Sequence, residues 1–338
     1  MTHDSLPFHV VTGVSVRRIL DRTLRRAITS VEQAYLAHHD GQTINPDSYF
    51  LRFPQRPSDR IIALPAAVDG SINVTGIKWI ASYPSNLGKG LARASATLVL
   101  NDPATGYPFA FLEASQISAV RTAASAVLAA NWCTGHVRRA ASVAFIGAGV
   151  IAKNIFDMFV ADEWTFDEVV VHDRDLQSSE SLSAHAARRI AAKVRVDTLS
   201  AALDADLVVF ATNAGTPYVD TPTRLRAGQT ILNISLRDLA PSLLMEANNV
   251  VDDVDHCLKA DTSPHLAEKM SGGRTFINGT IAQLIRGEIA LDPARATVFS
   301  PFGLGVLDLA IGKQVYDIAV ADNLALSVPG FFPEVARW

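Results

Sequence analysis

The chain has 338 residues, of which 49% are hydrophobic and 19% charged. This composition excludes a disordered or fibrous protein and predicts a globular one large enough for two domains. A formal net charge of −4 argues against a nucleic-acid partner, because such partners usually bind a strongly basic face. Two cysteines predict no disulfide framework and fit a cytoplasmic protein, and no apolar run predicts export or a membrane span.

The first part of the chain predicts an α+β arrangement. Between Ser15 and Ala37 the apolar residues recur at helical spacing, which predicts one amphipathic helix. From Tyr49 to Leu112 the chain consists of short runs rich in branched residues between turns, as in "INVTGIKWIASYP" and "ATLVLND", which predict strands. A helix of small and apolar residues follows, to about Trp132.

From Ala141 onward, short apolar strands alternate with helices. This pattern is typical of a parallel sheet covered on both faces, so we predict a Rossmann-type doubly wound domain. The predicted division is a doubly wound domain over 131–300 and a first domain over 1–130, which the long helix of 301–338 completes.

A dinucleotide-binding turn is predicted where the first of these strands meets its helix. "SVAFIGAGVIA" carries Gly147 and Gly149, followed by Val150, Ile151 and a small residue, Ala152. In the dinucleotide fold the first glycine makes the turn, the second lets the pyrophosphate approach, and phosphate binds the first N–H groups of the helix. Ordinary glycines at a strand-to-helix corner are the alternative.

Asp173 ends the next strand, "VVVHD", where a carboxylate binds the adenine ribose hydroxyls. This placement favours NAD over NADP. Arg174 leaves the alternative open, because an arginine there can accept a 2′-phosphate, stack on adenine or simply face solvent.

Four cations precede this domain in largely apolar settings, namely Arg52 in "YFLRFP", Lys78 in "GIKWI", Arg93 in "GLARAS" and Arg121 in "ISAVRTAASA". Together they predict a site for a substrate with several carboxylates, although each alone also fits a snorkelling surface side chain. If the helix starts near Ser118, Arg121 and Thr122 lie in its first turn, where free N–H groups attract anions.

The chain resembles the ornithine cyclodeaminase and mu-crystallin family through "GIKW", "LVLND", "ISAVRTAASA", the "GAG" turn and "FSPFGLGVLDLA". Within it, "YFLRFP", "RASATLVLND" and "CLKADTSPHL" look most like N-(2-amino-2-carboxyethyl)-L-glutamate dehydrogenases of 2,3-diaminopropionate biosynthesis. The resemblance implies a homodimer whose first domain and last helix bind substrate and partner. It also implies an NAD-dependent oxidation of that amine, then imine hydrolysis to 2-oxoglutarate and L-2,3-diaminopropionate, a siderophore or peptide-antibiotic precursor.

The resemblance also implies roles for individual residues. Lys78 and Arg121 match carboxylate ligands, Thr122 matches a pyrophosphate contact, and Asp238 matches the aspartate that acts on the reacting amine and water. Lys78 and Asp238 are therefore the expected catalytic residues. The residues around Asp238, "SLRDLAP", depart from the cyclodeaminase pattern, which makes ornithine cyclisation doubtful.

The remaining candidates are weaker. Thr212 and Asn213 follow the strand "DLVVF" and are predicted to contact the cofactor, with helix capping as the alternative. The resemblance places Ser235 and Ser300 near the nicotinamide. His265 is either a substrate neighbour or a structural loop residue. The acidic run "VDDVDH" is not expected to bind metal, because ligands crowded on an extended segment alternate in direction.

Several other functions stay open at this stage. The enzyme alternatives are ornithine cyclodeaminase, alanine dehydrogenase and ketimine reductase, and the alternative without catalysis is a crystallin-type nucleotide-binding protein. Loss of Asp238 or of the four cations would favour the binding protein, but all five residues are present.

Overall fold

The structure is a computed structural model that describes residues 6–220 and 225–332. The chain divides into two compact units, Met1–Arg121 with Leu304–Trp338 (unit 1) and Thr122–Gly303 (unit 2). Helix α3 (Ser115–Cys133) crosses this division, so the boundary predicted at residue 131 falls near its end. No helix in the described ranges is long and apolar enough to cross a bilayer.

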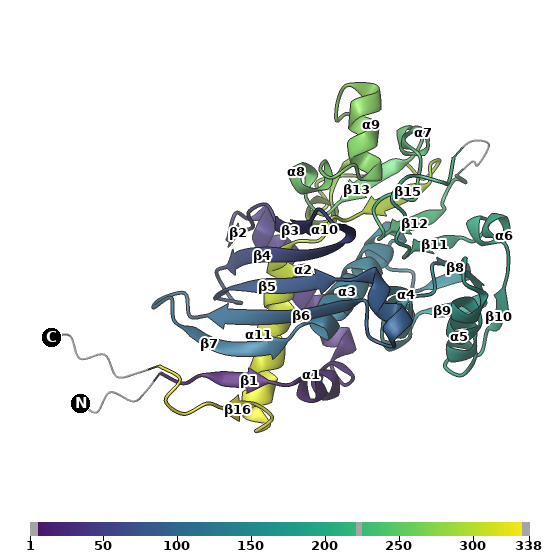
Figure 1. The fold of residues 1–338 in the computed structure, drawn as a ribbon. Coiled ribbons are helices and arrows are strands. Elements are labelled where there is room, and N and C mark those ends of the chain that lie inside the picture. The colour runs from purple at the N-terminus through teal and green to yellow at the C-terminus, as the bar shows by residue number, and fades with distance from the viewer. Residues whose placement is uncertain (1–5, 221–224, 333–338) are drawn as a thin grey trace. The chain divides into compact units, whose positions relative to one another are not determined.

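Unit 1 is built on a largely antiparallel sheet of eight strands, β16-β1-β7-β6-β5-β4-β2, with β3 paired to β4 (Figure 1). Only β1 and β7 run parallel. The strands are β1 (His9–Val11), β2 (Thr43–Ile44), β3 (Tyr49–Phe53), β4 (Arg56–Val68), β5 (Val74–Ser82), β6 (Ala94–Asn101), β7 (Pro108–Glu113) and β16 (Leu326–Ser327), with a 3₁₀ turn η1 (Pro84–Lys89).

Helix α11 (Gly305–Ala321) covers one face of this sheet, together with α2 (Leu24–His39) and α1 (Gly13–Leu20). Strand residues that point toward the helices are fully buried, such as Val74, Leu98 and Leu112. The single helix predicted over Ser15–Ala37 is wrong. The apolar spacing continues past Leu20, but the chain turns at Asp21–Thr23 and starts a second helix.

Unit 2 contains the predicted parallel sheet, with strand order β10-β9-β8-β11-β12-β15-β13-β14. Its strands are β8 (Arg139–Ile146), β9 (Thr165–His172), β10 (Lys193–Val196), β11 (Leu207–Phe210), β12 (Thr230–Asn233), β13 (Asn248–Val251), β14 (Gly279–Thr280) and β15 (Thr297–Ser300). The four residues of β11, β12, β13 and β15 are all buried, which explains their unbroken apolar or neutral sequences.

The helices of unit 2 are α4 (Val150–Ala161), α5 (Leu176–Ala187), α6 (Leu199–Leu203), α7 (Pro241–Met245), α8 (Val254–Cys257), α9 (Ser263–Ser271) and α10 (Ile281–Arg286). The chain moves outward from β8 through β9 to β10, then returns to β11 on the other side of β8. Right-handed crossovers in opposite directions put the connecting helices on opposite faces, which makes the sheet doubly wound. The strand order therefore reverses beside β8, where such sheets bind ligands.

Candidate functional site

The predicted glycine turn lies between β8 and α4, and its two glycines have different roles. Gly147 has a φ of 92°, and a Cβ there would lie 2.5 Å from the carbonyl oxygen of Ala211. A side chain at Gly147 would therefore clash with the end of β11. Gly149 precedes α4, and among the described residues no atom lies within 4 Å of where its Cβ would be. Gly149 thus leaves open space at the start of the helix.

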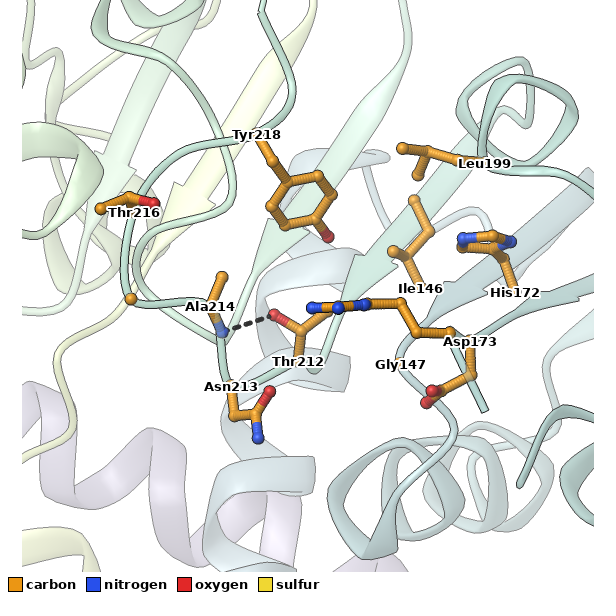
Figure 2. A pocket seen from close by; sticks show the side chains of 12 residues that line it. Ile146, Gly147, His172, Asp173, Leu199, Thr212, Asn213, Ala214, Thr216 and Tyr218 are labelled. Carbon is orange, nitrogen blue, oxygen red and sulfur yellow. Dashed lines mark hydrogen bonds between the residues drawn. The ribbon is translucent and has the colours of Figure 1, made fainter. Parts of the chain in front are cut away.

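A cavity of about 490 Å³ opens in unit 2 at the carboxyl ends of β8, β9 and β11. Figure 2 shows Thr212, Asn213 and Tyr218 on one side of it and His172 and Asp173 on the other. The lining residues are Ile146, Gly147, His172, Asp173, Arg174, Leu199, Thr212, Asn213, Ala214, Gly215, Thr216 and Tyr218. Five predicted cofactor residues, including Arg174, thus line the same cavity. Val150 and Ile151 begin α4 and do not line it, and Val150 is 65% exposed.

Asp173 connects the glycine turn to the end of β9. Its Oδ2 accepts a hydrogen bond from the backbone N–H of Ala148 at 2.6 Å, and its Oδ1 accepts one from Asp175 at 2.9 Å. Each carboxylate oxygen has a second lone pair, so Asp173 can still accept hydrogen bonds from a ligand.

Asp238 lies at the centre of a hydroxyl network. Its Oδ1 accepts hydrogen bonds from Thr212 Oγ1 at 2.5 Å and from the Tyr218 hydroxyl at 2.9 Å, and Ser235 donates to Oδ2. The Asp238 side chain is fully buried, whereas Thr212 and Tyr218 line the cavity. Burial and the Asp238 charge raise the pKa of the Tyr218 hydroxyl far above its usual range, so Tyr218 stays a hydrogen-bond donor. Asp238 is therefore connected to the cavity by hydrogen bonds from the hydroxyl groups of Thr212 and Tyr218.

Local backbone strain accompanies this network. Leu236, two residues before Asp238, has a φ of 78°, which is rare for a branched side chain. Its carbonyl accepts a hydrogen bond from the N–H of Ser263, and the Arg237 guanidinium donates to the carbonyl of Ala260. These bonds hold the strained turn against the segment 260–263.

Three further predicted residues, Ser235, Ser300 and His265, also lie outside the cavity lining. Ser235 contacts Asp238 instead. Ser300 is buried at the end of β15, where its Oγ accepts from Asn233 Nδ2 at 3.1 Å. The ring Nδ1 of His265 accepts the N–H of Asp261 at 3.0 Å, which is the structural role given above as its alternative.

The acidic residues after β13 form hydrogen bonds within the fold. Asp252 is buried and accepts the N–H groups of Phe302 at 2.9 Å and Gly303 at 2.7 Å. Its pKa is raised because burial outweighs these bonds. Within residues 6–220 and 225–332, no three His, Cys, Asp or Glu side chains gather as a metal site would require.

In unit 1, Lys78 and Arg121 are brought together by a third residue, Asp308 of α11. Lys78 Nζ lies 2.6 Å from Asp308 Oδ2, and Arg121 Nε lies 3.2 Å from Oδ1. Lys78 also donates to Ser118 Oγ at 3.1 Å. The Asp308 side chain is fully buried and that of Lys78 is 2% exposed, whereas Arg121 keeps 14% exposure. The three side chains form a buried triad with a formal charge of +1.

Burial lowers the pKa of Lys78 from 10.5 to about 8, Asp308 opposes that change, and the charge of Arg121 reinforces it. Lys78 is therefore protonated at neutral pH but loses its proton much more readily than an exposed lysine.

The expected position of Arg121 in the first turn of its helix is wrong. Helix α3 begins at Ser115, so Arg121 lies in the second turn and Thr122 follows it. The N–H of Ser115 donates at 2.7 Å to the carboxylate of Glu113, which also receives the N–H of Gln116. The N–H groups at the start of α3 are therefore bound by the carboxylate of Glu113. The charge of Arg121 is balanced by Asp308, not by the helix dipole.

Arg52 and Arg93 lie elsewhere in unit 1 and do not join the triad. The Arg52 guanidinium stacks 4.8 Å above the Phe50 ring, and Arg93 Nε donates to Ser82 Oγ at 3.3 Å. Arg93 lies next to Ser82 at the end of β5, and Arg52 lies two strands away at the same level, whereas Lys78 is four residues earlier in β5.

Sequence reasoning missed Asp308 and Tyr218. Asp308 was visible as a lone acid in the apolar segment "GVLDLAIG", where a buried carboxylate needs a cation. Tyr218 had no comparable signal, because its importance comes from the contact with Asp238.

The chain is similar to two dehydrogenases over most of its length. It is 28% identical to N-((2S)-2-amino-2-carboxyethyl)-L-glutamate dehydrogenase of Staphylococcus aureus, over 89% of this chain and 92% of that protein. It is also 28% identical to alanine dehydrogenase of Archaeoglobus fulgidus, over 91% and 95%.

The fold is shared with a solved dimer of an archaeal alanine dehydrogenase with bound NAD. The TM-score is 0.86 at 24% identity, and the match covers 96% of this chain and all of that one. The sequence profile of the ornithine cyclodeaminase/mu-crystallin family matches residues 10–323. The chain therefore belongs to the ornithine cyclodeaminase/mu-crystallin family.

Proposed function

We propose that this protein is an NAD-dependent oxidoreductase that acts on a CH–NH bond of an acidic amino acid. The substrate that we propose is N-(2-amino-2-carboxyethyl)-L-glutamate. Its oxidation to an imine and the hydrolysis of that imine yield 2-oxoglutarate and L-2,3-diaminopropionate, a precursor for siderophores or peptide antibiotics. The 28% identity to the Staphylococcus aureus dehydrogenase supports this choice. The main structural observation behind it is the triad of Lys78, Arg121 and Asp308.

The triad supports the binding of an α-carboxylate. A buried lysine and arginine around one aspartate leave one net positive charge, and Arg121 is the member that remains partly exposed. Arginine pairs with a carboxylate through two parallel hydrogen bonds, so Arg121 is suited to hold the carboxylate next to the reacting carbon.

The cavity of unit 2 fits NAD. The open space at Gly149 admits a pyrophosphate, Asp173 can accept ribose hydroxyls, and within the described residues no side chain caps α4. When bound there, NAD supplies the acceptor for the hydride. Thr122, Thr212, Asn213, Ser235 and Ser300 stay proposed contacts of the cofactor.

We assign the proton transfers of imine hydrolysis to Asp238. Because its carboxylate is buried behind Thr212 and Tyr218, a proton leaving the attacking water passes through one of these hydroxyls. The hydroxyl takes the proton from water and gives its own to Asp238 Oδ1, so no charge stays on the hydroxyl. A carboxylate in this position also stabilises a cationic imine.

We propose a homodimer formed through the sheet face opposite α11. The strand pairings put Tyr49, Leu51, Trp79 and Phe111 on this face, with exposures of 73, 47, 45 and 38%. A second copy would bury this apolar surface, and the archaeal relative is a dimer. Light scattering should give twice the chain mass. Trp79→Glu should give the monomer, whereas Val14→Glu on α1, at an 81% exposed position, should not.

Cys133 and Cys257 are free thiols, which accords with a cytoplasmic location.

NADH formation tests the proposed reaction. Purified protein is incubated with NAD⁺ and N-(2-amino-2-carboxyethyl)-L-glutamate, and in parallel with alanine and with ornithine. We expect NADH and 2-oxoglutarate in equal amounts from the first substrate only. A clear signal with alanine or ornithine and none with the first substrate would refute the proposed specificity.

A further inference from the structure

The last residue of β9, His172, lines the cavity of unit 2 next to the glycine turn. Its carbonyl accepts a hydrogen bond from the N–H of Gly147 at 2.8 Å, and it pairs in register with Ile146 of β8. Figure 2 shows the His172 ring extending from the end of β9 toward the opposite side of the cavity. The ring is half-buried, so a ligand in the cavity can contact it.

A single hydrogen bond determines which nitrogen of the His172 ring carries the hydrogen. Nδ1 lies 2.9 Å from the carbonyl oxygen of Asp197, the residue that follows β10. A carbonyl oxygen can only accept, so Nδ1 must donate. In the neutral ring, Nε2 is then a hydrogen-bond acceptor. Within residues 6–220 and 225–332, no group donates a hydrogen bond to Nε2.

This part of the cavity lies on the adenosine side of the proposed NAD site. Strand β9 lies on one side of β8, whereas β11 and β12 lie on the other. Thr212, which connects the cavity to Asp238, follows β11. Asp173, which can accept ribose hydroxyls, directly follows His172. Because the glycine turn between the two sides binds the pyrophosphate, the base next to Asp173 is adenine.

The cavity surface beside His172 is apolar. Leu199 begins α6, two residues after Asp197, and packs against the core of unit 2 with part of its side chain exposed. Ile146 is buried at the end of β8. Binding pockets of this kind hold a flat ring by hydrophobic contact, and a few polar groups select its edge. Here the polar group is the unpaired Nε2 of His172.

We propose that His172 selects adenine by accepting a hydrogen bond at Nε2 from the 6-amino group of the base. Leu199 contacts the ring face. The 6-amino group is a donor, so it complements a neutral imidazole nitrogen. This inference rests on the proposed function only in placing NAD in this cavity, and it does not depend on the substrate. A base with oxygen in place of the amino group presents a second acceptor to Nε2 and is disfavoured.

Two dinucleotides test this role. One is NAD⁺, and the other is nicotinamide hypoxanthine dinucleotide, in which an oxygen replaces the 6-amino group. Calorimetry measures the binding of each without substrate at about pH 8.5, above the range in which histidine side chains usually change charge. The proteins are wild type, His172→Asn, Leu199→Ala and the control His136→Asn. Circular dichroism and Tm confirm that each variant folds.

The two asparagine variants are matched. The side-chain nitrogen of asparagine takes about the position of Nδ1, so His172→Asn keeps a donor for the Asp197 carbonyl and removes Nε2. If His172 were only a link to Asp197, this variant would behave as wild type. His136 is exposed and does not line the cavity, and its φ of 64° is a conformation that asparagine adopts readily.

Wild type and His136→Asn should bind NAD⁺ about tenfold more tightly than the hypoxanthine dinucleotide, because only NAD⁺ pairs with Nε2. His172→Asn should bind NAD⁺ about 3- to 10-fold more weakly than wild type and should bind both dinucleotides alike. Leu199→Ala should weaken both and keep the wild-type ratio.

Equal affinity of wild type for the two dinucleotides overturns the role of His172, and so does a wild-type ratio in His172→Asn. If wild type shows the expected ratio but forms no NADH with the acidic substrate, the proposed reaction fails and the role of His172 stands. If wild type binds neither dinucleotide, both proposals are overturned.

Discussion

The carboxylate of Asp308 lies 2.6 Å from the ammonium group of Lys78, and both side chains are buried. The two residues are 230 positions apart in the chain, and the contact places an anion of the last helix against a cation of a central strand. This pair controls the charge of the proposed substrate site.

The first prediction concerns the pH dependence of substrate binding. Burial lowers the pKa of Lys78 to about 8, so the ammonium form is lost as pH rises through that value. The value of kcat/KM for the acidic substrate should therefore fall above about pH 8, mainly through KM. Rates measured across pH 6–10 check this, and a flat profile to pH 10 would contradict it.

Stability should change in the opposite direction over the same range. Because the pKa of Lys78 is lower in the folded chain than in the unfolded chain, the unfolded chain binds more protons between about pH 8 and 10.5. The contribution of Lys78 to the free energy of unfolding therefore rises with pH across this window. Lys78→Met removes this contribution. The free energy of unfolding of wild type minus that of the variant should therefore rise between about pH 8 and 10.5, as measured by urea unfolding at each pH.

Asp308→Asn should be strongly destabilising. It leaves Lys78 buried beside Arg121 without an anion, and breaking a buried ion pair in this way costs about 3–5 kcal/mol. It should also lower the pH above which kcat/KM falls, because Asp308 raises the pKa of Lys78. Urea unfolding and the pH profile measure the two effects. The double variant Lys78→Met, Asp308→Asn should lose less than the two single variants added together.

Alanine substitutions at the two glycines of the nucleotide turn should have different effects, one on stability and the other on NAD binding. Gly147→Ala meets the Ala211 carbonyl at positive φ and should lower Tm. Gly149→Ala meets no described atom, so it should keep the wild-type Tm but weaken NAD binding by about tenfold or more, because its methyl group occupies space needed for the pyrophosphate. Gly273→Ala, also in open space, is the control for both measurements. Equal NAD affinity in Gly149→Ala and wild type would remove the turn from the proposed site.

Loss of the Asp238 carboxylate should affect the reaction rate and not the binding of NAD, because Asp238 is buried outside the cavity lining. Asp238→Asn should lower kcat by about 10²–10⁴, the usual contribution of general acid–base catalysis. Tyr218→Phe should have a smaller effect, because Thr212 still donates to Asp238. Thr216→Val changes a cavity residue outside the network and should leave the rate of imine hydrolysis unchanged. Stopped-flow NADH formation and 2-oxoglutarate release separate the two steps, and an Asp238→Asn protein with both rates intact would remove the assigned role.

Local patterns predicted much of unit 2, and long-range contacts explain what they missed. The buried strands β11 and β12 read as apolar runs because both faces of a parallel sheet are covered. The triad could not be predicted in the same way, since residues 78, 121 and 308 meet only through tertiary packing. The start of α3 was misplaced because the side chain of Glu113, which lies before the helix, caps it.

The discontinuity of unit 1 has a consequence for biosynthesis. Unit 2 is one continuous segment, whereas unit 1 needs α11, which the ribosome delivers only after all of unit 2. Until then Lys78 and Arg121 lack Asp308, and the sheet lacks the helix that covers it. Unit 2 can therefore fold before α11 has been synthesised, and the part of unit 1 that precedes unit 2 must wait for the part that follows it.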